Sequence, residues 1–202
     1  MNLYKELQEK LSEHKPTDVD ELILDDLFEN VKFFTEENKK DLEKYTNLIH
    51  LSLNGFGLES LKNFPKIPTL QVLELRSNQL TGNDFAKLKE LYPELYKLKV
   101  GENPIKDTNV FKVLSDSSIR KLELSDTPAS TAKDYRNALF SMISGLESVD
   151  RITKDGKEAS STLYEDDEEM GESGEDEFDG EEDEEFDDYE DDEEAYEEES
   201  EH

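Results

Sequence analysis

Residues 70–80 of the chain read LQVLELRSNQL, and they carry the strongest structural signal in the sequence. Leucines at positions 70, 73, 75 and 80 and an asparagine at position 78 fill the pattern L-x-x-L-x-L-x-x-N-x-L. The central x-L-x-L-x segment predicts a short strand, because alternate side chains of a strand point to the same face. Asn78 lies where the chain turns off that strand, and its amide can hydrogen-bond the backbone of the turn.

The same pattern recurs along the chain at a nearly constant spacing. Residues 95–105 form a second complete copy, whereas 48–58 and 119–127 place phenylalanine and threonine at the asparagine position, and 19–24 are a partial copy. The four fuller copies start 22, 25 and 24 residues apart, within the period of about 20–29 residues of leucine-rich repeats. One unit cannot bury its leucines alone. The pattern therefore predicts an α/β solenoid of about five leucine-rich repeats, with a parallel sheet on its concave side.

Both ends of the repeat array carry patterns typical of caps. Leucines 3, 7 and 11 form an apolar stripe at helical spacing. They predict a capping helix over residues 1–15, which Pro16 ends. Residues 135–143 predict a second amphipathic helix that stops near Gly145, and residues 146–152 are predicted to form a last edge strand.

Charge divides the chain into two different parts. Residues 165–202 hold 26 Asp or Glu and no Lys or Arg, whereas the preceding 164 residues hold 28 acids and 23 bases. So acidic a segment lacks the apolar surface needed to fold alone. We therefore predict a leucine-rich-repeat domain over residues 1–159, with its C-terminal cap at 134–159, and a disordered acidic tail over 160–202.

Several function classes receive no support from the composition. The chain has no cysteine, three widely separated histidines, and no glycine-rich phosphate loop or nucleophile motif. We therefore expect no enzyme, no cofactor and no metal site. No apolar run approaches the roughly 18 residues of a membrane helix, and an acidic tail repels nucleic-acid phosphates. We expect a soluble, intracellular monomer that binds proteins, without a membrane partner or strong nucleic-acid binding.

The acidic tail is the first candidate binding segment, because aromatic residues recur among its acids. Carboxylates attract a basic partner, while an aromatic ring can fill an apolar pocket on it. A purely solubilising segment is the alternative interpretation. We favour binding of histones or other basic proteins, and the candidate residues are Glu177, Phe178, Glu185, Phe186, Asp187, Asp188 and Tyr189.

The concave face of the sheet is the second candidate. Strand residues that alternate with the buried leucines are expected to point there. The candidates are Asp25, His50, Asn54, Glu74, Arg76, Lys97, Lys99, Lys121 and Glu123. Most of the cations belong to the later repeats, which predicts a basic half; a solvated strand face is the alternative. A sharper hypothesis is that the acidic tail folds back onto these lysines until a more basic partner displaces it.

Two hydroxyl residues near the acids are candidates for phosphorylation. Thr162 and Ser173 each have an acidic residue three positions later, as acidophilic kinases prefer. A phosphate adds about −1.5 to −2 charge. On a tail that is already strongly negative, this increment predicts tuning of affinity and not an on–off switch.

The sequence resembles the acidic leucine-rich nuclear phosphoprotein 32 family over its whole length. The matching segments are residues 17–25, 73–78, 134–140 (DYRNALF), 150–151 and 155–159, followed by the acidic tail. The resemblance implies histone binding and chaperoning, masking of histones from acetyltransferases, inhibition of a type 2A serine/threonine phosphatase, and residence in nucleus and cytoplasm. A phosphatase regulator is therefore the first alternative function. An adaptor in an RNA–protein complex is the second, because repeat domains of this size also serve there.

Overall fold

The computed structural model describes residues 15–27 and 31–159. The chain divides into two units, residues 1–161 and 162–202, and the second lies wholly outside the described residues. The tail expected over residues 160–202 also lies outside them, as does the capping helix expected over 1–15, apart from Lys15. Both remain predictions.

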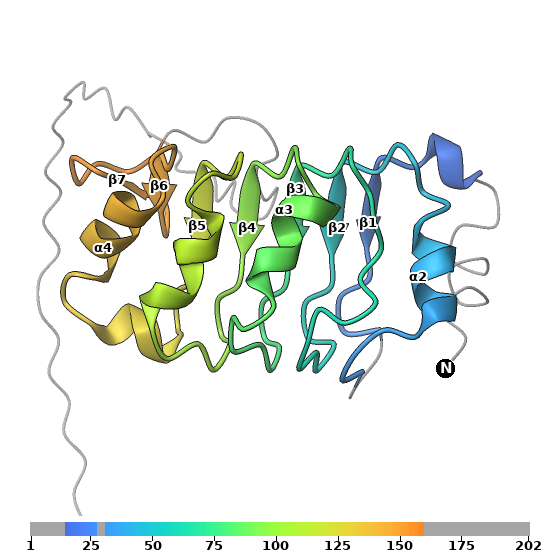
Figure 1. Ribbon diagram of the computed structural model, residues 1–202, viewed down its shortest axis with the longest axis horizontal. Coiled ribbons are helices and arrows are strands. Elements are labelled where there is room, and N and C mark those ends of the chain that lie inside the picture. The colour runs from blue at the N-terminus through green and yellow to red at the C-terminus, as the bar shows by residue number, and fades with distance from the viewer. Residues whose placement is uncertain (1–14, 28–30, 160–202) are drawn as a thin grey trace, which may run out of the picture. The chain divides into compact units, whose positions relative to one another are not determined.

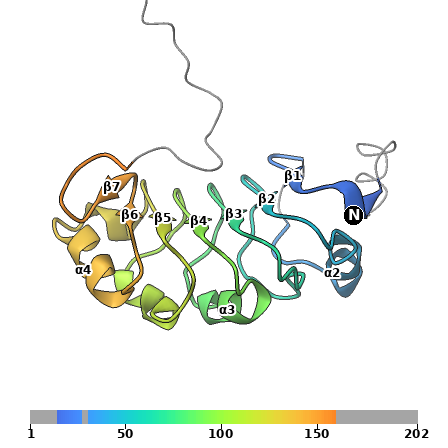
Figure 2. The same cartoon turned by 90° about the horizontal axis from the view of Figure 1, so that it is seen from above.

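The described residues form one sheet in which the strands follow the order of the sequence. Strands β1 to β6 pair in parallel with their neighbours, and β6 and β7 pair antiparallel. Their bounds are β1 Glu21–Ile23, β2 His50–Ser52, β3 Val72–Glu74, β4 Lys97–Lys99, β5 Lys121–Glu123, β6 Ser148–Val149 and β7 Ile152–Thr153. In the repeat domain the strands line the concave side and the helices the convex side (Figures 1 and 2). This arrangement confirms the predicted leucine-rich-repeat solenoid.

The return segments between the strands form the convex layer. Three are α-helical: α2 Glu36–Leu42, α3 Leu88–Leu91 and α4 Tyr135–Met142. 3₁₀ helices occupy Phe85–Lys87, Thr108–Leu114 and Pro128–Thr131, and one more, Pro16–Asp18, precedes β1. Among these described helices, none is long and apolar enough to cross a membrane.

The core follows from the leucine pattern. The parallel register places Leu22, Leu51, Leu73, Leu98 and Leu122 side by side across β1 to β5, and each is at most 2% exposed. Because the strands are in phase, a leucine of one repeat always packs against the matching leucine of the next. Rings from the return segments close the other side of the core, for example Phe85 on Phe111 with centroids 5.4 Å apart.

Buried asparagines hold the turns after the strands. The side-chain amide of Asn78 donates to the carbonyls of Leu75 and Arg76, at 3.0 Å each, in its own repeat. It also donates to the carbonyl of Leu53, at 3.0 Å, and accepts from the backbone N–H of Leu58, at 2.9 Å, in the preceding repeat. The predicted role of this asparagine is confirmed, and the contact to the preceding repeat adds to it.

The C-terminal cap differs from its sequence prediction in two details. Helix α4 ends at Met142, three residues before Gly145. The single edge strand predicted over residues 146–152 is wrong, because the chain reverses and forms the two short strands β6 and β7. Asp150 and Arg151 adopt left-handed φ angles of 48° and 62°, which an extended strand cannot contain.

Candidate functional site on the concave face

The concave face consists of the side chains that alternate with the buried leucines. In β1, Glu21 and Ile23 are exposed on either side of buried Leu22. The parallel register continues these positions in two rows across the sheet: His50, Val72, Lys97 and Lys121 follow Glu21, and Ser52, Glu74, Lys99 and Glu123 follow Ile23. Most of the predicted concave-face residues therefore lie on one surface.

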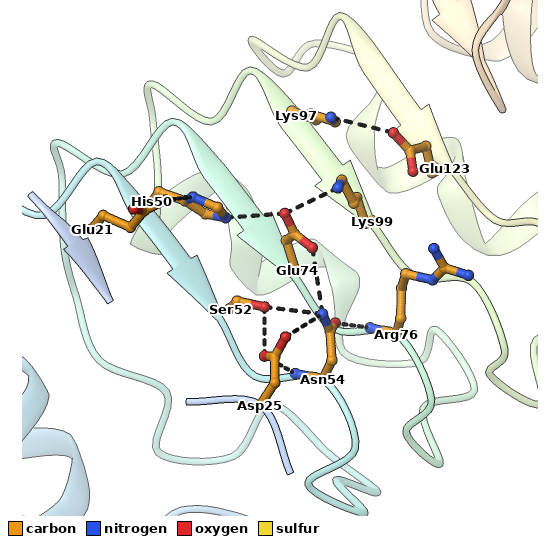
Figure 3. A network of polar contacts seen from close by, with 10 residues as sticks. All are labelled: Glu21, Asp25, His50, Ser52, Asn54, Glu74, Arg76, Lys97, Lys99 and Glu123. Atoms are coloured by element: carbon orange, nitrogen blue, oxygen red, sulfur yellow. Dashed lines mark hydrogen bonds and ion pairs between the residues drawn. The ribbon is translucent and has the colours of Figure 1, made fainter. Parts of the chain in front are cut away.

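Glu74 lies at the centre of this surface and contacts both neighbouring strands (Figure 3). Its Oε1 atom is 3.0 Å from Nε2 of His50 on β2 and 3.1 Å from Nζ of Lys99 on β4. The other ring nitrogen of His50, Nδ1, is 2.7 Å from Oε1 of Glu21 on β1. Acidic and basic side chains thus alternate across four adjacent strands.

Burial and pairing act in opposite directions on the ionisation of this network. Burial disfavours charge on Glu74, but the hydrogen bond from His50 and the ammonium of Lys99 outweigh it and lower the pKa of Glu74 to about 2. Burial likewise opposes a charge on His50, yet its hydrogen bonds to Glu74 and Glu21 raise the pKa of His50 above the usual 6.5. The site therefore favours an ionised carboxylate between two cationic groups.

Asp25 and Asn54 form a second cluster beside this network (Figure 3). Oδ1 of Asp25 accepts hydrogen bonds from Oγ of Ser52 at 2.6 Å and from the backbone N–H of Asn54 at 2.9 Å. The side-chain amide of Asn54 donates to Oδ2 of Asp25 at 2.9 Å, and its oxygen accepts the backbone N–H of Arg76 at 2.7 Å. These two predicted site residues tie together the ends of three repeats.

The cations from which the sequence predicted a basic half of the concave face all have partners in the structure. Lys99 is only 3% exposed and is paired with Glu74. Lys97 pairs with Glu123 at 3.4 Å, Arg76 pairs with Glu102 at 2.7 Å, and Nζ of Lys121 lies 5.7 Å from the ring centre of Tyr96. Three of these four cations are therefore compensated by carboxylates of neighbouring repeats.

Two residues of this surface were missed at the level of sequence. Glu102 binds both Arg76 and the hydroxyl of Ser77, and Tyr96 lies under Lys121 while its hydroxyl donates to Glu147 at 3.2 Å. Aligning the repeats would have indicated Glu102, since it follows its strand at the same position as Ser77. Glu102 and Ser77 also adopt left-handed φ angles, of 56° and 53°.

The remaining predicted site residues cannot be placed in this geometry. The tail candidates Glu177, Phe178, Glu185, Phe186, Asp187, Asp188 and Tyr189, and the phosphorylation candidates Thr162 and Ser173, lie outside the described residues. Within residues 15–27 and 31–159, no group of three or more His, Cys, Asp or Glu side chains is arranged to hold a metal ion.

Comparison with curated proteins places the chain among known relatives. It is 32% identical over 164 residues to the acidic leucine-rich nuclear phosphoprotein 32-related protein of Plasmodium falciparum, covering 77% of this chain and 58% of the relative. It is 34% identical over 120 residues to acidic leucine-rich nuclear phosphoprotein 32 family member A of Drosophila pseudoobscura pseudoobscura, covering 59% of this chain and 45% of the relative. The chain is a homologue of the acidic leucine-rich nuclear phosphoprotein 32 proteins. No protein-family model matches it.

The nuclear phosphoprotein 32 relatives are longer than the part that this chain matches. A related protein 1 of Oryza sativa subsp. japonica is 33% identical over 117 residues, which cover 58% of this chain and 25% of the relative. The chain therefore spans about half the length, or less, of these curated relatives.

Comparison with solved structures supports the fold independently. A chain of the Drosophila melanogaster SNF/U2A′ complex superposes with a TM-score of 0.58 at 22% sequence identity. The match covers 74% of this chain and 83% of that chain. At this identity the likeness shows the repeat architecture alone.

Proposed function

We propose that this nuclear phosphoprotein 32 homologue binds histones or other basic proteins, and that the acidic tail supplies most of the electrostatic attraction. The observation that carries this proposal is the distribution of charge. Residues 165–202 hold 26 acidic residues and no Lys or Arg, whereas the charges on the concave face of the repeat domain are mostly paired with one another.

The pairing on the concave face supports the assignment of most of the electrostatic attraction to the tail. A charged partner would have to displace existing contacts such as those of Glu74 with His50 and Lys99. Breaking a buried pair costs about 3–5 kcal/mol when one charge is left without a partner. Residues 165–202 contain no Lys or Arg. A cationic protein therefore does not have to displace a Lys or Arg of the same segment to reach these carboxylates.

The aromatic residues of the tail give the proposal its specificity. Phe178, Phe186 and Tyr189 lie among acidic residues, so each can place a ring on a partner that the carboxylates attract. Charge steers the encounter and makes it sensitive to salt, whereas a ring buried in an apolar pocket adds a contact that salt does not screen. The tail then shields the Lys and Arg side chains of a histone from DNA phosphates.

The proposal is tested by measuring binding of purified core histones to the full-length chain and to a chain that ends at residue 159. Fluorescence anisotropy at salt concentrations from about 0.05 M to about 0.3 M separates screened from unscreened contributions. We expect tight, salt-sensitive binding by the full chain and a loss of at least about tenfold in affinity without the tail. Far-UV circular dichroism checks that the shortened chain is folded.

A triple variant, Phe178→Ser, Phe186→Ser and Tyr189→Ser, separates the rings from the charge. The proposal expects the variant to bind histones more weakly than the unaltered chain at every salt concentration. The dependence of its affinity on salt should be unchanged. Equal affinities of the variant and the unaltered chain would reduce the tail to a source of charge. Undetectable histone binding by the full chain at low salt would refute the proposed function.

The proposed setting of this activity is the nucleus, since the relatives are named nuclear phosphoproteins.

The full-length chain and the chain that ends at residue 159 also distinguish the alternative functions. A phosphatase regulator would change the activity of a type 2A phosphatase in a manner that depends on the tail, whereas an adaptor would retain its partner when residues 160–202 are removed.

A further inference from the structure

An exposed apolar side chain lies among carboxylates on the concave side of β1. Ile23 is 47% exposed, while its neighbours Leu22 and Leu24 are buried in the core. The backbone continues in strand-like pairing beyond β1, because the N–H groups of Leu24 and Asp26 donate to the carbonyls of Ser52 and Asn54. Glu21, Ile23 and Asp25 therefore share one face, and we call them the acidic-apolar column.

Negative charge is less compensated at this column than elsewhere on the sheet. Residues 15–27 hold five acids and one base, Lys15. The hydrogen-bond donors to the Asp25 side chain belong to the neutral residues Ser52 and Asn54. Glu21 contacts His50 through one carboxylate oxygen, and its side chain is still 56% exposed. Within the described part of the chain, Asp25 forms no ion pair.

Apolar exposure is concentrated at the same end of the repeat domain. Among the described residues four large hydrophobic side chains are exposed, and three of them, Ile23, Leu27 and Phe33, fall in the first repeat. The fourth, Val113, belongs to the 3₁₀ helix Thr108–Leu114. An apolar group flanked by carboxylates is a suitable contact for a cationic segment that also carries an aliphatic or aromatic side chain.

We propose that the acidic-apolar column docks an extended basic segment with the pattern basic-x-apolar-x-basic. Alternate residues of an extended chain lie about 6.6–6.8 Å apart on one face. Glu21 and Ile23 alternate in this way in β1, and Asp25 follows where the backbone pairing continues just beyond the strand. A partner segment in the same conformation places its central apolar side chain on Ile23 and its two cations on Glu21 and Asp25. This inference rests on the proposed function and adds a second contact, on the folded domain, for the same basic partner.

The column selects by spacing, which charge alone cannot do. The carboxylates of the tail attract Lys and Arg wherever these lie in a partner, because attraction between exposed charges depends weakly on geometry. At the column the apolar contact forms only when the apolar residue is the central one of the alternating three. Two peptides of equal composition and charge are therefore bound equally by the tail and unequally by the column.

The test uses the full-length chain and two synthetic peptides of identical composition. One contains Arg-Ser-Leu-Ser-Arg, and the other contains Arg-Leu-Ser-Ser-Arg, which moves the leucine out of phase. The methyl signal of Ile23 is followed by NMR in protein with ¹³C-labelled isoleucine methyl groups, and those of buried Ile105 and Ile119 serve as internal references. We expect the in-phase peptide to shift the Ile23 signal and to bind about fivefold more tightly than the out-of-phase peptide.

The variant Ile23→Thr keeps the β-branched shape of the strand residue and removes apolar contact. We expect it to abolish the roughly fivefold preference for the in-phase peptide. Val113→Thr makes the matched change at an exposed β-branched residue far along the array, in the 3₁₀ helix Thr108–Leu114, and it leaves the preference intact. Equal binding of the two peptides to the unaltered chain, or an unmoved Ile23 signal during binding, would overturn the inference while leaving the proposed function standing. Failure of histones to bind the full chain would instead refute the proposed function.

Discussion

Replacing Glu74 with glutamine removes the negative charge that joins two cationic groups on the concave face. The side chain of Glu74 is 10% exposed, and its carboxylate lies 3.0 Å from His50 and 3.1 Å from Lys99, whose side chain is itself 3% exposed. Glutamine keeps the shape of the side chain and can still form a hydrogen bond. The variant therefore isolates the effect of leaving the ammonium of Lys99 buried without a counter-charge.

The expected loss of stability is large for a single substitution. Lowering the pKa of Glu74 from 4.5 to about 2 corresponds to roughly 3 kcal/mol of net stabilisation of the ionised carboxylate in the folded state. Removing one member of a buried ion pair costs about 3–5 kcal/mol in other proteins. We expect Glu74→Gln to lower the free energy of unfolding by about 3 kcal/mol at about pH 7.

The pH dependence of this loss is the sharper part of the prediction. Since the pKa is lowered on folding, the stabilisation by Glu74 is fully present above its unfolded value of 4.5 and disappears as the pH falls toward about 2. Urea unfolding, followed by far-UV circular dichroism at several pH values, measures the difference between the two proteins. That difference should shrink as the solution is acidified below about pH 4.5.

A matched variant shows whether the charge of Lys99 is responsible. In Glu74→Gln combined with Lys99→Met the buried ammonium is gone, so part of the lost stability should return. A difference below about 0.5 kcal/mol at neutral pH, which is typical of surface substitutions, would refute the reasoning. So would a deficit of constant size from neutral to acidic pH.

Three further predictions concern the buried asparagine of the turns, the C-terminal cap and His50. Asn78→Ala removes four hydrogen bonds to backbone groups and should lower the free energy of unfolding by about 3 kcal/mol, whereas the control Asn83→Ala, at an exposed position, should change it by less than about 0.5 kcal/mol. Tyr135→Phe removes the 2.7 Å hydrogen bond to Asp150 and should cost about 2 kcal/mol in urea unfolding; because burial and this bond raise the pKa of Tyr135 to about 12, its contribution is lost as the pH rises above about 10. An NMR titration of His50 should give a pKa above 6.5, so its stabilising contribution is present below that value and is lost as the pH rises through the folded pKa; a value at or below 6.5 would contradict the network.

The sequence predicts the repeat architecture well because the leucine pattern repeats the geometry of the sheet. Leucines at fixed offsets must be buried together, so the positions of Leu51, Leu73 and Leu98 determine the register of their strands. The offset also predicts which residues share the concave face. Local composition gives less warning of the break after β6. Aspartate tolerates left-handed φ angles, but Arg151 is not a residue type that commonly marks such a turn.

Pairing on the concave face could not be predicted from residue types alone. Lys97 and Lys99 have the same charge and lie two residues apart, yet one pairs with Glu123 and the other with Glu74. Which carboxylate a lysine reaches depends on distances of a few ångströms between neighbouring strands. The expected basic half therefore becomes a set of cross-strand pairs, and the exposed acidic-apolar column becomes the less compensated part.

The side-chain amides of the buried asparagines Asn78 and Asn103 bind backbone groups of the repeat that precedes their own, so the repeats support one another in one direction along the chain. Asn78 supports Leu53 and Leu58 of the repeat before it, and Asn103 in turn accepts from the N–H of Leu80 and donates to the carbonyl of Leu75. The turns that follow β2 and β3 thus each rely on a buried asparagine of the next repeat. Damage near the C-terminal cap should spread toward the N-terminus one repeat at a time, whereas trimming an equal length from the front should leave the remaining turns supported.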